Sequence, residues 1–254
     1  MRAAFQQPAA RIRFDWGLAG ARAVTGPPGT AAVVVDVLSF STAVSVATDL
    51  GIEILPFRWR DDRAAEFAEA HHARLAVGRR DGGPSLSPAS IRAWAVRPDP
   101  GRLVLPSPNG SSICFALADR GSPVLAGCLR NAAAVAGWLA GELAAGRLAA
   151  VAVIAAGERW PDGSLRPAVE DLWGAGAVLH RLGRLAPELP ASPEARAAAA
   201  AFAAAEPELR QQLRECASGV ELIEDGFDED VAIAAELDAA RAAPLLDRGR
   251  FRPA

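Results

Sequence analysis

The chain of 254 residues contains neither lysine nor tyrosine, and all 27 of its basic residues are arginines. Chemistry that needs a P-loop lysine, a Schiff-base lysine or a tyrosine acid is therefore excluded. An anionic ligand has to be held by arginine side chains, by main-chain N–H groups or by a metal ion. These absences narrow the kinds of site that the chain can build.

Cysteine and histidine are also scarce, with three residues of each type. The cysteines are Cys114, Cys128 and Cys216. A set this small and odd in number argues against a disulfide framework, so we expect buried thiols and a reducing compartment. The spacing of the histidines shows no Ser-His-Asp or Cys-His arrangement for nucleophilic catalysis.

Long apolar runs and basic clusters are missing as well. The longest apolar stretch, residues 148–156, is far too short to cross a bilayer, and residues 1–13 do not resemble a signal sequence. The net charge of −3 argues against a nucleic-acid partner. We therefore expect a cytoplasmic protein with no membrane or nucleic-acid partner, and a homo-oligomer is compatible with this sequence.

Strand patterns and helix patterns alternate along most of the chain. Strands are predicted at residues 12–14, 33–37, 52–55, 75–78, 103–105, 124–126 and 151–156. Helices are predicted at residues 41–49, 61–73, 131–143, 168–182, 194–205, 207–217 and 231–242, with shorter ones ending at Arg22 and Ala118. This order predicts a three-layer α/β/α fold with a largely parallel or mixed sheet.

The composition shifts towards proline and alanine near Leu185, without a true linker. We therefore expect residues 1–254 to form a single α/β domain, in which residues 184–220 are a helical insertion or an appended C-terminal helical region.

The most informative segment begins with three consecutive valines, residues 33–35, which predict a fully buried strand. Asp36 interrupts the apolar run, and Ser39, Ser41 and Thr42 follow at the start of a helix. A carboxylate at a strand end suits a cation, and the hydroxyls and N–H groups of a helix start suit a phosphate. In open α/β sheets, ligands bind at this end of the strands.

Other strand–turn–helix junctions carry similar groups. They present Asn109, Gly110, Ser111 and Ser112, then Arg130 and Asn131, then Gly157 and Glu158, and finally Glu170 and Asp171 at a helix start. If the strands are parallel, all of these groups lie along one edge of the sheet. Together they would supply the ligands for a divalent cation and an oxyanion.

Each junction also has a purely structural interpretation. Asp36 alone could cap the next turn, and Asn109–Gly110 is a common turn dipeptide. Serine and asparagine are common N-caps in any α/β protein. Adjacent residues on a helix point about 100° apart, so only one of Glu170 and Asp171 is expected to face the site.

Six segments in this order resemble the 2-phosphosulfolactate phosphatase family. They are Val-Val-Asp-Val-Leu (34–38), Ser-Pro-Asn-Gly-Ser (107–111), Leu-Arg-Asn-Ala-Ala-Ala-Val-Ala (129–136), Ala-Ala-Gly-Glu (155–158), Glu-Asp-Leu-Trp-Gly-Ala-Gly (170–176) and Gly-Phe-Asp-Glu-Asp-Val (226–231). The resemblance implies a three-layer α/β fold and magnesium-dependent hydrolysis of 2-phospho-3-sulfolactate to 3-sulfolactate and phosphate, a step towards coenzyme M. By motif match, Asp36, Asn109, Glu170 and Asp171 become site candidates.

The chain departs from the family pattern at several positions. Ser39 stands where the family commonly has arginine, Gly78-Arg79-Arg80 replaces Gly-Glu-Arg, and Leu86-Ser87-Pro88 replaces Asn-Ser-Pro. Losing one arginine removes a bidentate clamp for an anion, which Arg79 could restore from another direction. The resemblance therefore supports the phosphatase reaction more strongly than the sulfolactate substrate.

The working hypothesis is metal-assisted hydrolysis of a phosphate ester on a small phosphorylated acid. The catalytic candidates are Asp36, Glu170 and Asp171, and the Mg²⁺ candidates are Asp36, Glu158, Glu170 and Asp171. The substrate-binding candidates are Ser39, Ser41, Thr42, Arg80, Asn109, Gly110, Ser111, Arg130 and Asn131. Two alternatives stay open: a phosphatase of another small phosphorylated 2-hydroxy acid, and a non-catalytic anion-binding homologue.

Overall fold

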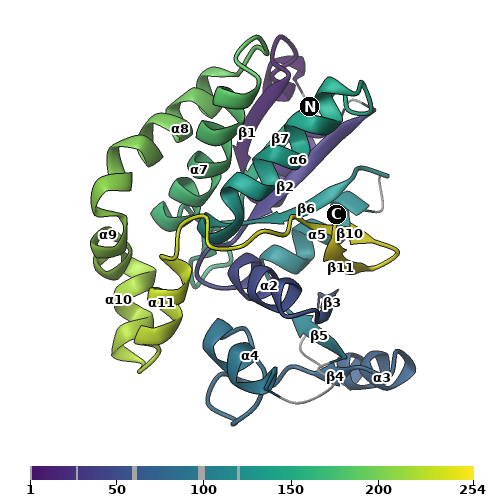
Figure 1. Ribbon diagram of the computed structural model, residues 1–254, viewed down its shortest axis with the longest axis vertical. Helices are drawn as coiled ribbons and strands as arrows, with labels where there is room; N and C mark the ends of the chain where they lie inside the picture. The colour runs from purple at the N-terminus through teal and green to yellow at the C-terminus, as the bar shows by residue number, and fades with distance from the viewer. Residues whose placement is uncertain (1, 27, 59–61, 97–100, 119–120) are drawn as a thin grey trace.

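The computed structural model describes residues 2–26, 28–58, 62–96, 101–118 and 121–254 (Figure 1). Its main feature is a mixed sheet of nine strands: β1 Ile12–Trp16, β2 Thr30–Val35, β3 Glu53–Phe57, β4 Arg74–Leu75, β5 Arg102–Pro106, β6 Val124–Gly127, β7 Ala150–Ala155, β10 Pro244–Asp247 and β11 Arg250–Pro253. A separate small hairpin is formed by β8 Glu158–Arg159 and β9 Leu165–Arg166. The predicted α/β class with a mixed sheet is confirmed.

The sheet consists of two parallel blocks joined by a hairpin. One block has the order β1-β7-β2-β6, the other has the order β3-β5-β4, and β10–β11 lies between them. The hairpin pairs antiparallel with β6 through Leu245 and Leu125, and antiparallel with β3 through Phe251 and Ile54. The two blocks therefore run in opposite senses, and a common edge exists only within each block.

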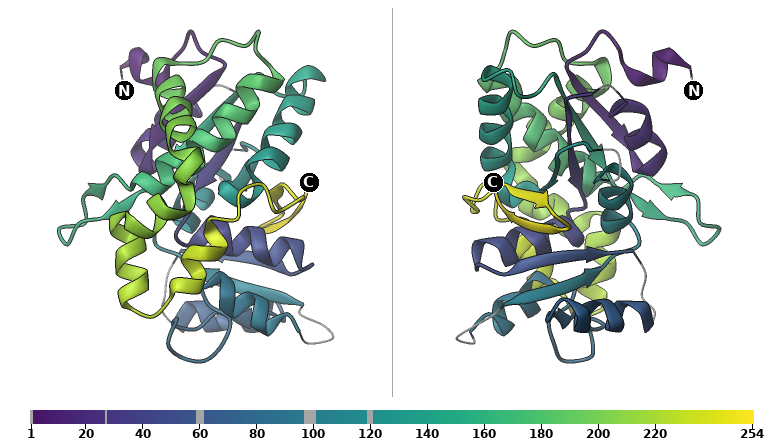
Figure 2. Two further views of the ribbon diagram at one scale, coloured as in Figure 1. Left: turned by 60° about the vertical axis from the view of Figure 1, so that its left-hand side comes forward. Right: turned by 90° about the vertical axis from the view of Figure 1, so that its right-hand side faces the viewer.

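Helices cover both faces of the sheet (Figure 2). They are α1 Gly17–Val24, α2 Phe40–Asp49, α3 Asp62–Ala70, α4 Pro88–Trp94, α5 Gly110–Ala118, α6 Ala132–Ala144, α7 Val169–Leu185, α8 Pro193–Ala205, α9 Leu209–Glu215, α10 Ala217–Glu224 and α11 Asp228–Ala234. Val33 and Val35 of β2 pack in a core with α6, α7 and α8, whereas Val34 packs in a core with α2 and α5. Burial of both faces explains the unbroken run of valines and gives three layers.

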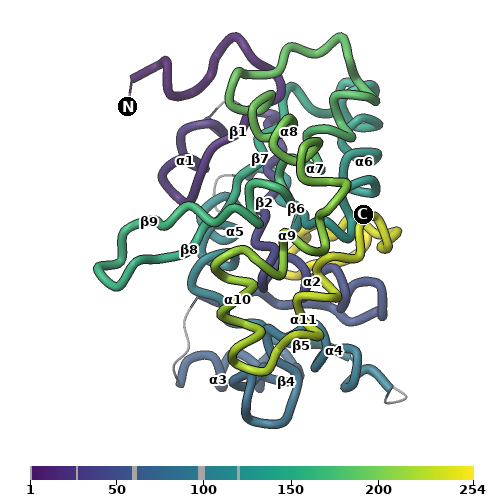
Figure 3. The backbone as a smooth tube through the Cα atoms, turned by 90° about the vertical axis from the view of Figure 1, so that its left-hand side faces the viewer, coloured from purple at the N-terminus to yellow at the C-terminus, as the bar shows by residue number. Residues whose placement is uncertain are grey.

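The helical segment predicted at residues 184–220 packs directly on the first block. Phe202 of α8, together with Leu209 and Leu213 of α9, belongs to the same hydrophobic core as Val33 and Val35 of β2. Figure 3 shows α8, α9 and α10 running along one side of the molecule, with the β8–β9 hairpin projecting beside them. The assignment of a single domain stays a prediction.

Several predicted boundaries differ from the structure. The last helix ends at Ala234, and the C-terminal segment forms the β10–β11 hairpin rather than a helix to residue 242. The helix expected at 207–217 is divided at Cys216, which caps α10 by accepting from the Gly219 N–H. Asp61, the expected first residue of the third helix, lies outside the described residues. Within the described ranges, we find no helix with the length and apolar character that a membrane crossing requires.

Candidate functional site

A cavity of about 750 Å³ lies where β2 and β5 end. Its walls come from the turns after these two strands, from the β8–β9 hairpin and from α10. Asp36 and Ser39 line it after β2, and Asn109 lines it after β5. Segments that are distant in the chain therefore meet around one space large enough for a small molecule.

Asp36 is fixed at the edge of this cavity by main-chain donors. Its Oδ1 accepts the N–H groups of Ser39 (2.9 Å) and Phe40 (3.1 Å), and its Oδ2 accepts the N–H of Gly110 (3.2 Å). The last bond joins the end of β2 to the start of α5, although the two strand blocks run in opposite senses. The carboxylate is only 6% exposed and holds one orientation.

Gly110 makes this junction feasible because it leaves room for Phe40. A Cβ at position 110 would lie 2.3 Å from Cδ1 of Phe40, which a real contact does not allow. The hydroxyl of Ser41 closes the same turn, because it donates to the Asp36 carbonyl (2.8 Å) and accepts the Asp36 N–H (2.9 Å). Ser41 and Gly110 therefore shape the turn around Asp36.

Asp171 serves as a bridge between two strand ends. Its Oδ1 accepts the Val37 N–H (2.7 Å) and its Oδ2 accepts the Gly157 N–H (2.8 Å), so the first turn of α7 ties the end of β2 to the end of β7. Glu170, the neighbouring residue, is buried beside Cys216, and burial together with the Glu170 carboxylate raises the pKa of the Cys216 thiol to about 12. Both oxygens of Asp171 thus have main-chain partners.

Four carboxylates of like charge surround this region: Asp36, Glu158, Glu170 and Asp171. Burial raises the pKa of Asp36, with a further contribution from the charge of Glu170. Burial, then the charges of Asp36 and Glu170, raise the pKa of Asp171 well above its usual range and that of Glu158 to about 7. None of the four makes an ion pair with a described residue. The structure keeps negative charge together here without a directly bonded cation.

Arginines supply positive charge on the facing walls. Arg58, Arg79, Arg159 and Arg166 line the cavity. Asn109 is bound to β8 of the hairpin at both ends of its amide, since its Nδ2 donates to Glu158 (3.0 Å) and its Oδ1 accepts from Nε of Arg159 (3.1 Å). Arg58, Arg159 and Arg166 were not predicted as site residues from the sequence. Two of them follow strand ends or site residues, since Arg58 directly follows β3 and Arg159 directly follows Glu158.

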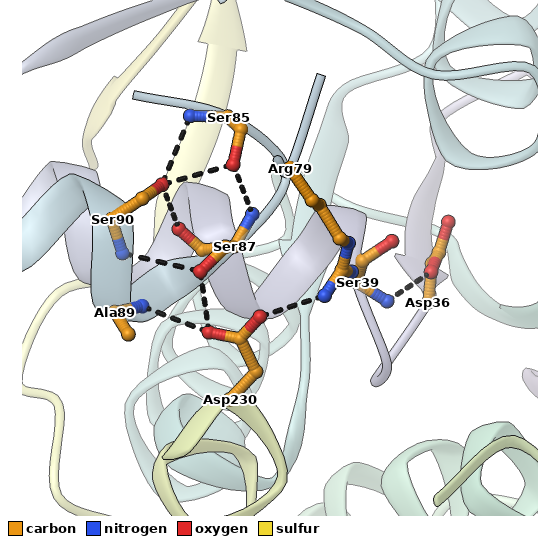
Figure 4. A network of polar contacts seen from close by, with 8 residues as sticks. All are labelled: Asp36, Ser39, Arg79, Ser85, Ser87, Ala89, Ser90 and Asp230. Atoms are coloured by element: carbon orange, nitrogen blue, oxygen red, sulfur yellow. Dashed lines mark hydrogen bonds and ion pairs between the residues drawn. The ribbon is translucent and has the colours of Figure 1, made fainter. Parts of the chain in front are cut away.

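Arg79 reaches the cavity through a buried polar network (Figure 4). Asp230 of α11 accepts Nη1 of Arg79 on one oxygen (2.7 Å), and the Ser87 hydroxyl (2.6 Å) and the Ala89 N–H (3.1 Å) on the other. Ser87 is the N-cap of α4, where its hydroxyl accepts the Ser90 N–H. One acidic side chain thereby joins α11, the start of α4 and an arginine of the cavity wall.

Arg80 and Arg130 are not among the described residues that line this cavity. The Arg80 side chain is 71% exposed and pairs with Asp225 (2.8 Å). Arg130 is buried, and it pairs with Glu236 and with Asp49 (3.6 Å) at the far end of α2. The structure therefore brings Arg79 to the cavity, pairs Arg80 with the lining residue Asp225, and places Arg130 among residues outside the lining.

The remaining predicted polar residues serve the local turns. Ser111 is fully buried and donates to the Leu105 carbonyl (3.2 Å). Asn131 accepts the Cys128 N–H (2.8 Å) and donates to the Ala126 carbonyl (3.0 Å). Thr42 is fully buried beside the Cys128 thiol. Of the predicted substrate-binding set, Ser39 and Asn109 line the cavity, and Gly110 acts through its bond to Asp36.

The donor set permits a divalent cation only in a restricted form. Among the described residues, no group of three or more histidine, cysteine, aspartate or glutamate side chains is arranged to hold a metal ion. Mg²⁺ in enzymes is commonly bound by one or two carboxylates, several waters and the substrate phosphate. Asp36 and Glu158 line the cavity and fit that pattern, whereas Asp171 is not among the described lining residues.

Comparison with known proteins identifies the family of the chain. The family model described as 2-phosphosulpholactate phosphatase matches residues 22–249, which is nearly the whole chain and includes every site segment described above. No curated protein sequence matches the chain. The chain therefore belongs to the 2-phosphosulpholactate phosphatase family, a family of phosphoric monoester hydrolases.

Proposed function

We propose that this protein is a magnesium-dependent phosphatase that hydrolyses 2-phospho-3-sulfolactate to 3-sulfolactate and phosphate, the reaction type of coenzyme M biosynthesis. The observation that carries this proposal is the cavity itself. Its lining combines two buried or half-buried carboxylates, Asp36 and Glu158, with four arginines, and the exposed Glu221 and Asp225 line it as well. Carboxylates suit the cation, and arginines suit the anionic groups of the substrate.

The charge of the substrate matches the cavity walls. Phosphosulfolactate carries a phosphate, a sulfonate and a carboxylate, and a guanidinium binds such planar or tetrahedral anions through several N–H donors. Arg58 and Arg79 lie on the β3 and α4 side, and Arg159 and Arg166 lie on the β8–β9 hairpin. Arginines on opposite walls would bind the anionic groups at both ends of the molecule.

Asp36 and Glu158 are the residues that would hold Mg²⁺. Burial and then the charge of Asp36 raise the pKa of Glu158, and a bound divalent cation would offset that repulsion. The bound ion would neutralise the phosphoryl oxygens and lower the pKa of a water molecule. Glu170 and Asp171 act behind them, since Asp171 fixes both strand ends and Glu170 adds negative charge.

Main-chain N–H groups and the side chain of Asn109 orient the two carboxylates of the cavity. The N–H groups of Ser39, Phe40 and Gly110 hold the Asp36 carboxylate in place, and Asn109 holds Glu158. Groups fixed before the substrate arrives need no reorganisation during the reaction. Turnover therefore depends on the turns after β2 and β5 as much as on the acidic side chains.

The direct test is phosphate release from 2-phospho-3-sulfolactate, measured with Mg²⁺ and in the presence of a chelator. We expect turnover with the cation, its loss in chelator and its recovery when Mg²⁺ is restored. A thermal shift with Mg²⁺ and inorganic phosphate gives a second readout, and the exposed Asp162→Asn variant is the matched control. Full activity in chelator would refute magnesium dependence, whereas binding of phosphate without turnover of any ester would indicate an anion-binding homologue.

A related substrate is the second candidate. Ser39 leaves the wall beside Asp36 without the arginine that the family commonly has there, and the cavity of about 750 Å³ exceeds what a three-carbon acid fills. Other phosphorylated 2-hydroxy acids therefore belong in the same assay. Faster turnover of one of them would assign the substrate and leave the reaction type unchanged.

A further inference from the structure

The segment at residues 226–231 looks from sequence alone like an ordinary helix start, with acidic residues in the first turn of α11. In the structure, Asp228 fits that role, because it is exposed and pairs with Arg214. Asp230 differs, since its side chain is only 3% exposed and accepts three hydrogen bonds. A buried carboxylate with this many partners is more than a helix-capping residue.

The two oxygens of Asp230 serve different parts of the protein. Oδ1 accepts from Ser87 and Ala89 at the start of α4, and Oδ2 accepts from Nη1 of Arg79. Phe227, one turn earlier, lies under the same arginine, with 5.4 Å between the Arg79 Cζ and the ring centre. In the view of Figure 4, Arg79 extends from Asp230 towards Ser39 and Asp36.

The contacts with Asp230 and Phe227 lower the entropy that Arg79 loses when it binds an anion. A long arginine side chain loses conformational entropy when a ligand fixes it. Arg79 is already held by a carboxylate and an aromatic ring, and its side chain is 19% exposed. Most of the ordering therefore takes place on folding, and less is lost when the anion binds.

We propose that Asp230 is a positioning residue for Arg79, so that the first turn of α11 sets the affinity of the cavity for the anionic groups of its substrate. The proposal rests on the proposed function in one respect, because it takes the anion to be a phosphorylated acid. Asp230 acts through Arg79 and does not contact the substrate. Its removal changes binding more than the chemical step.

The sharpest test is Asp230→Asn, because asparagine keeps an oxygen for Ser87 and Ala89 but presents an amide to Arg79. We expect the KM for phosphosulfolactate and the inhibition constant for inorganic phosphate to rise about tenfold, from the loss of one charge-assisted bond. The kcat should change little, even where the melting temperature falls because a buried ion pair is lost. Ser87→Ala is the matched control: it removes the α4 contact, so it should lower the melting temperature and leave KM unchanged.

Coupling between the two residues is measured with Arg79→Gln. This variant alone should raise KM at least as much as Asp230→Asn, and adding Asp230→Asn to it should have no further effect. Additive effects would overturn the proposal, as would a lower melting temperature at unchanged KM. Should Asp230→Asn fail to fold, Phe227→Leu gives the second variant, with an expected smaller rise in KM and unchanged kcat.

Failure of the proposed function would be distinguishable from failure of this inference. If the wild-type protein turns over no phosphorylated acid, inorganic phosphate binding is measured by titration calorimetry on the same variants. Weaker phosphate binding by both Asp230→Asn and Arg79→Gln, with no additivity, would still support the positioning role. Equal phosphate binding by all variants, or none by the wild type, would overturn it.

Discussion

Buried charged groups lie at both ends of α2 (Phe40–Asp49), but they are paired with opposite charges at one end only. At the C-terminal end, Asp49 and Glu236 pair with Arg130, and Glu236 also binds Arg92 through two hydrogen bonds of 2.6 and 3.1 Å. Positive and negative groups alternate in this cluster. At the N-terminal end, Asp36 lies among carboxylates that have no ion pair within the described chain.

The difference distinguishes a cluster that stabilises the fold from a cluster that serves the candidate site. Buried charges are costly to a fold unless they are paired, so a cluster with alternating signs is what stability requires. Like charges gathered beside a cavity are costly in the free protein and become favourable once a cation or an acidic proton is supplied. The same helix therefore begins at a site and ends at a structural cluster. Substitutions at Asp36, Arg130 and Glu158 test this division.

Asp36→Asn should have the largest effect on activity. Asparagine can still accept the Ser39 and Phe40 N–H groups, so the turn is retained, but the negative charge at the cavity is lost. We expect kcat for phosphate release to fall by about 10²- to 10³-fold, the usual effect of removing one group that stabilises the transition state. Circular dichroism should show an unchanged fold. An unchanged kcat would show that Asp36, at the N-terminal end of α2, is not part of the active site.

Arg130→Met should show the opposite pattern. Its removal leaves Asp49 without its ion pair and weakens the link to Glu236, which we expect to lower the free energy of unfolding by about 3 kcal/mol. Denaturant titration measures this loss, and kcat should stay at the wild-type value. Lost activity at full stability would instead make Arg130 a substrate-binding residue, as its motif position suggested.

Glu158→Gln tests the cost of the acidic cluster through pH. The pKa of Glu158 is raised from 4.5 to about 7, so the folded protein holds this proton more tightly than the unfolded chain does. Its contribution is therefore complete below pH 4.5 and is lost as the pH rises through 7. Without divalent cation, the glutamine variant should be more stable than the wild type at pH 8 by about 1–3 kcal/mol.

Thermal unfolding from pH 4 to pH 8 measures this difference. The advantage of the glutamine variant should disappear at pH 4, where Glu158 is protonated in both states. If the stability of the two proteins changes in parallel with pH, the charge of Glu158 does not destabilise the folded protein. Added Mg²⁺ at pH 8 should stabilise the wild type more than the variant, because Glu158 is a proposed ligand.

The parts of the site that sequence predicted well share one property, which is a strong local pattern. Three valines followed by Asp36 placed a carboxylate at the end of a buried strand, and the structure has that arrangement. The Asn109–Gly110 turn also meets the cavity. The structure differs where two neighbouring arginines had to be distinguished: Arg79 lines the cavity, while Arg80 does not line it and pairs with the exposed lining residue Asp225. Adjacent arginines look alike to any local pattern.

The layering of this protein follows from its sequence alone, because the apolar runs of the central strands and the apolar faces of the helices are encoded in neighbouring residues. The sequence also determined that a carboxylate follows β2. Three features are visible only in the tertiary structure. The β10–β11 hairpin divides the sheet, Asp171 bridges two strand ends, and Arg58, Arg79, Arg159 and Arg166 line the cavity. The reason is distance along the chain: Arg79 and Asp230 are 151 residues apart, and Arg130 and Glu236 are 106 apart. Partners of that kind are chosen by packing, which no local pattern contains.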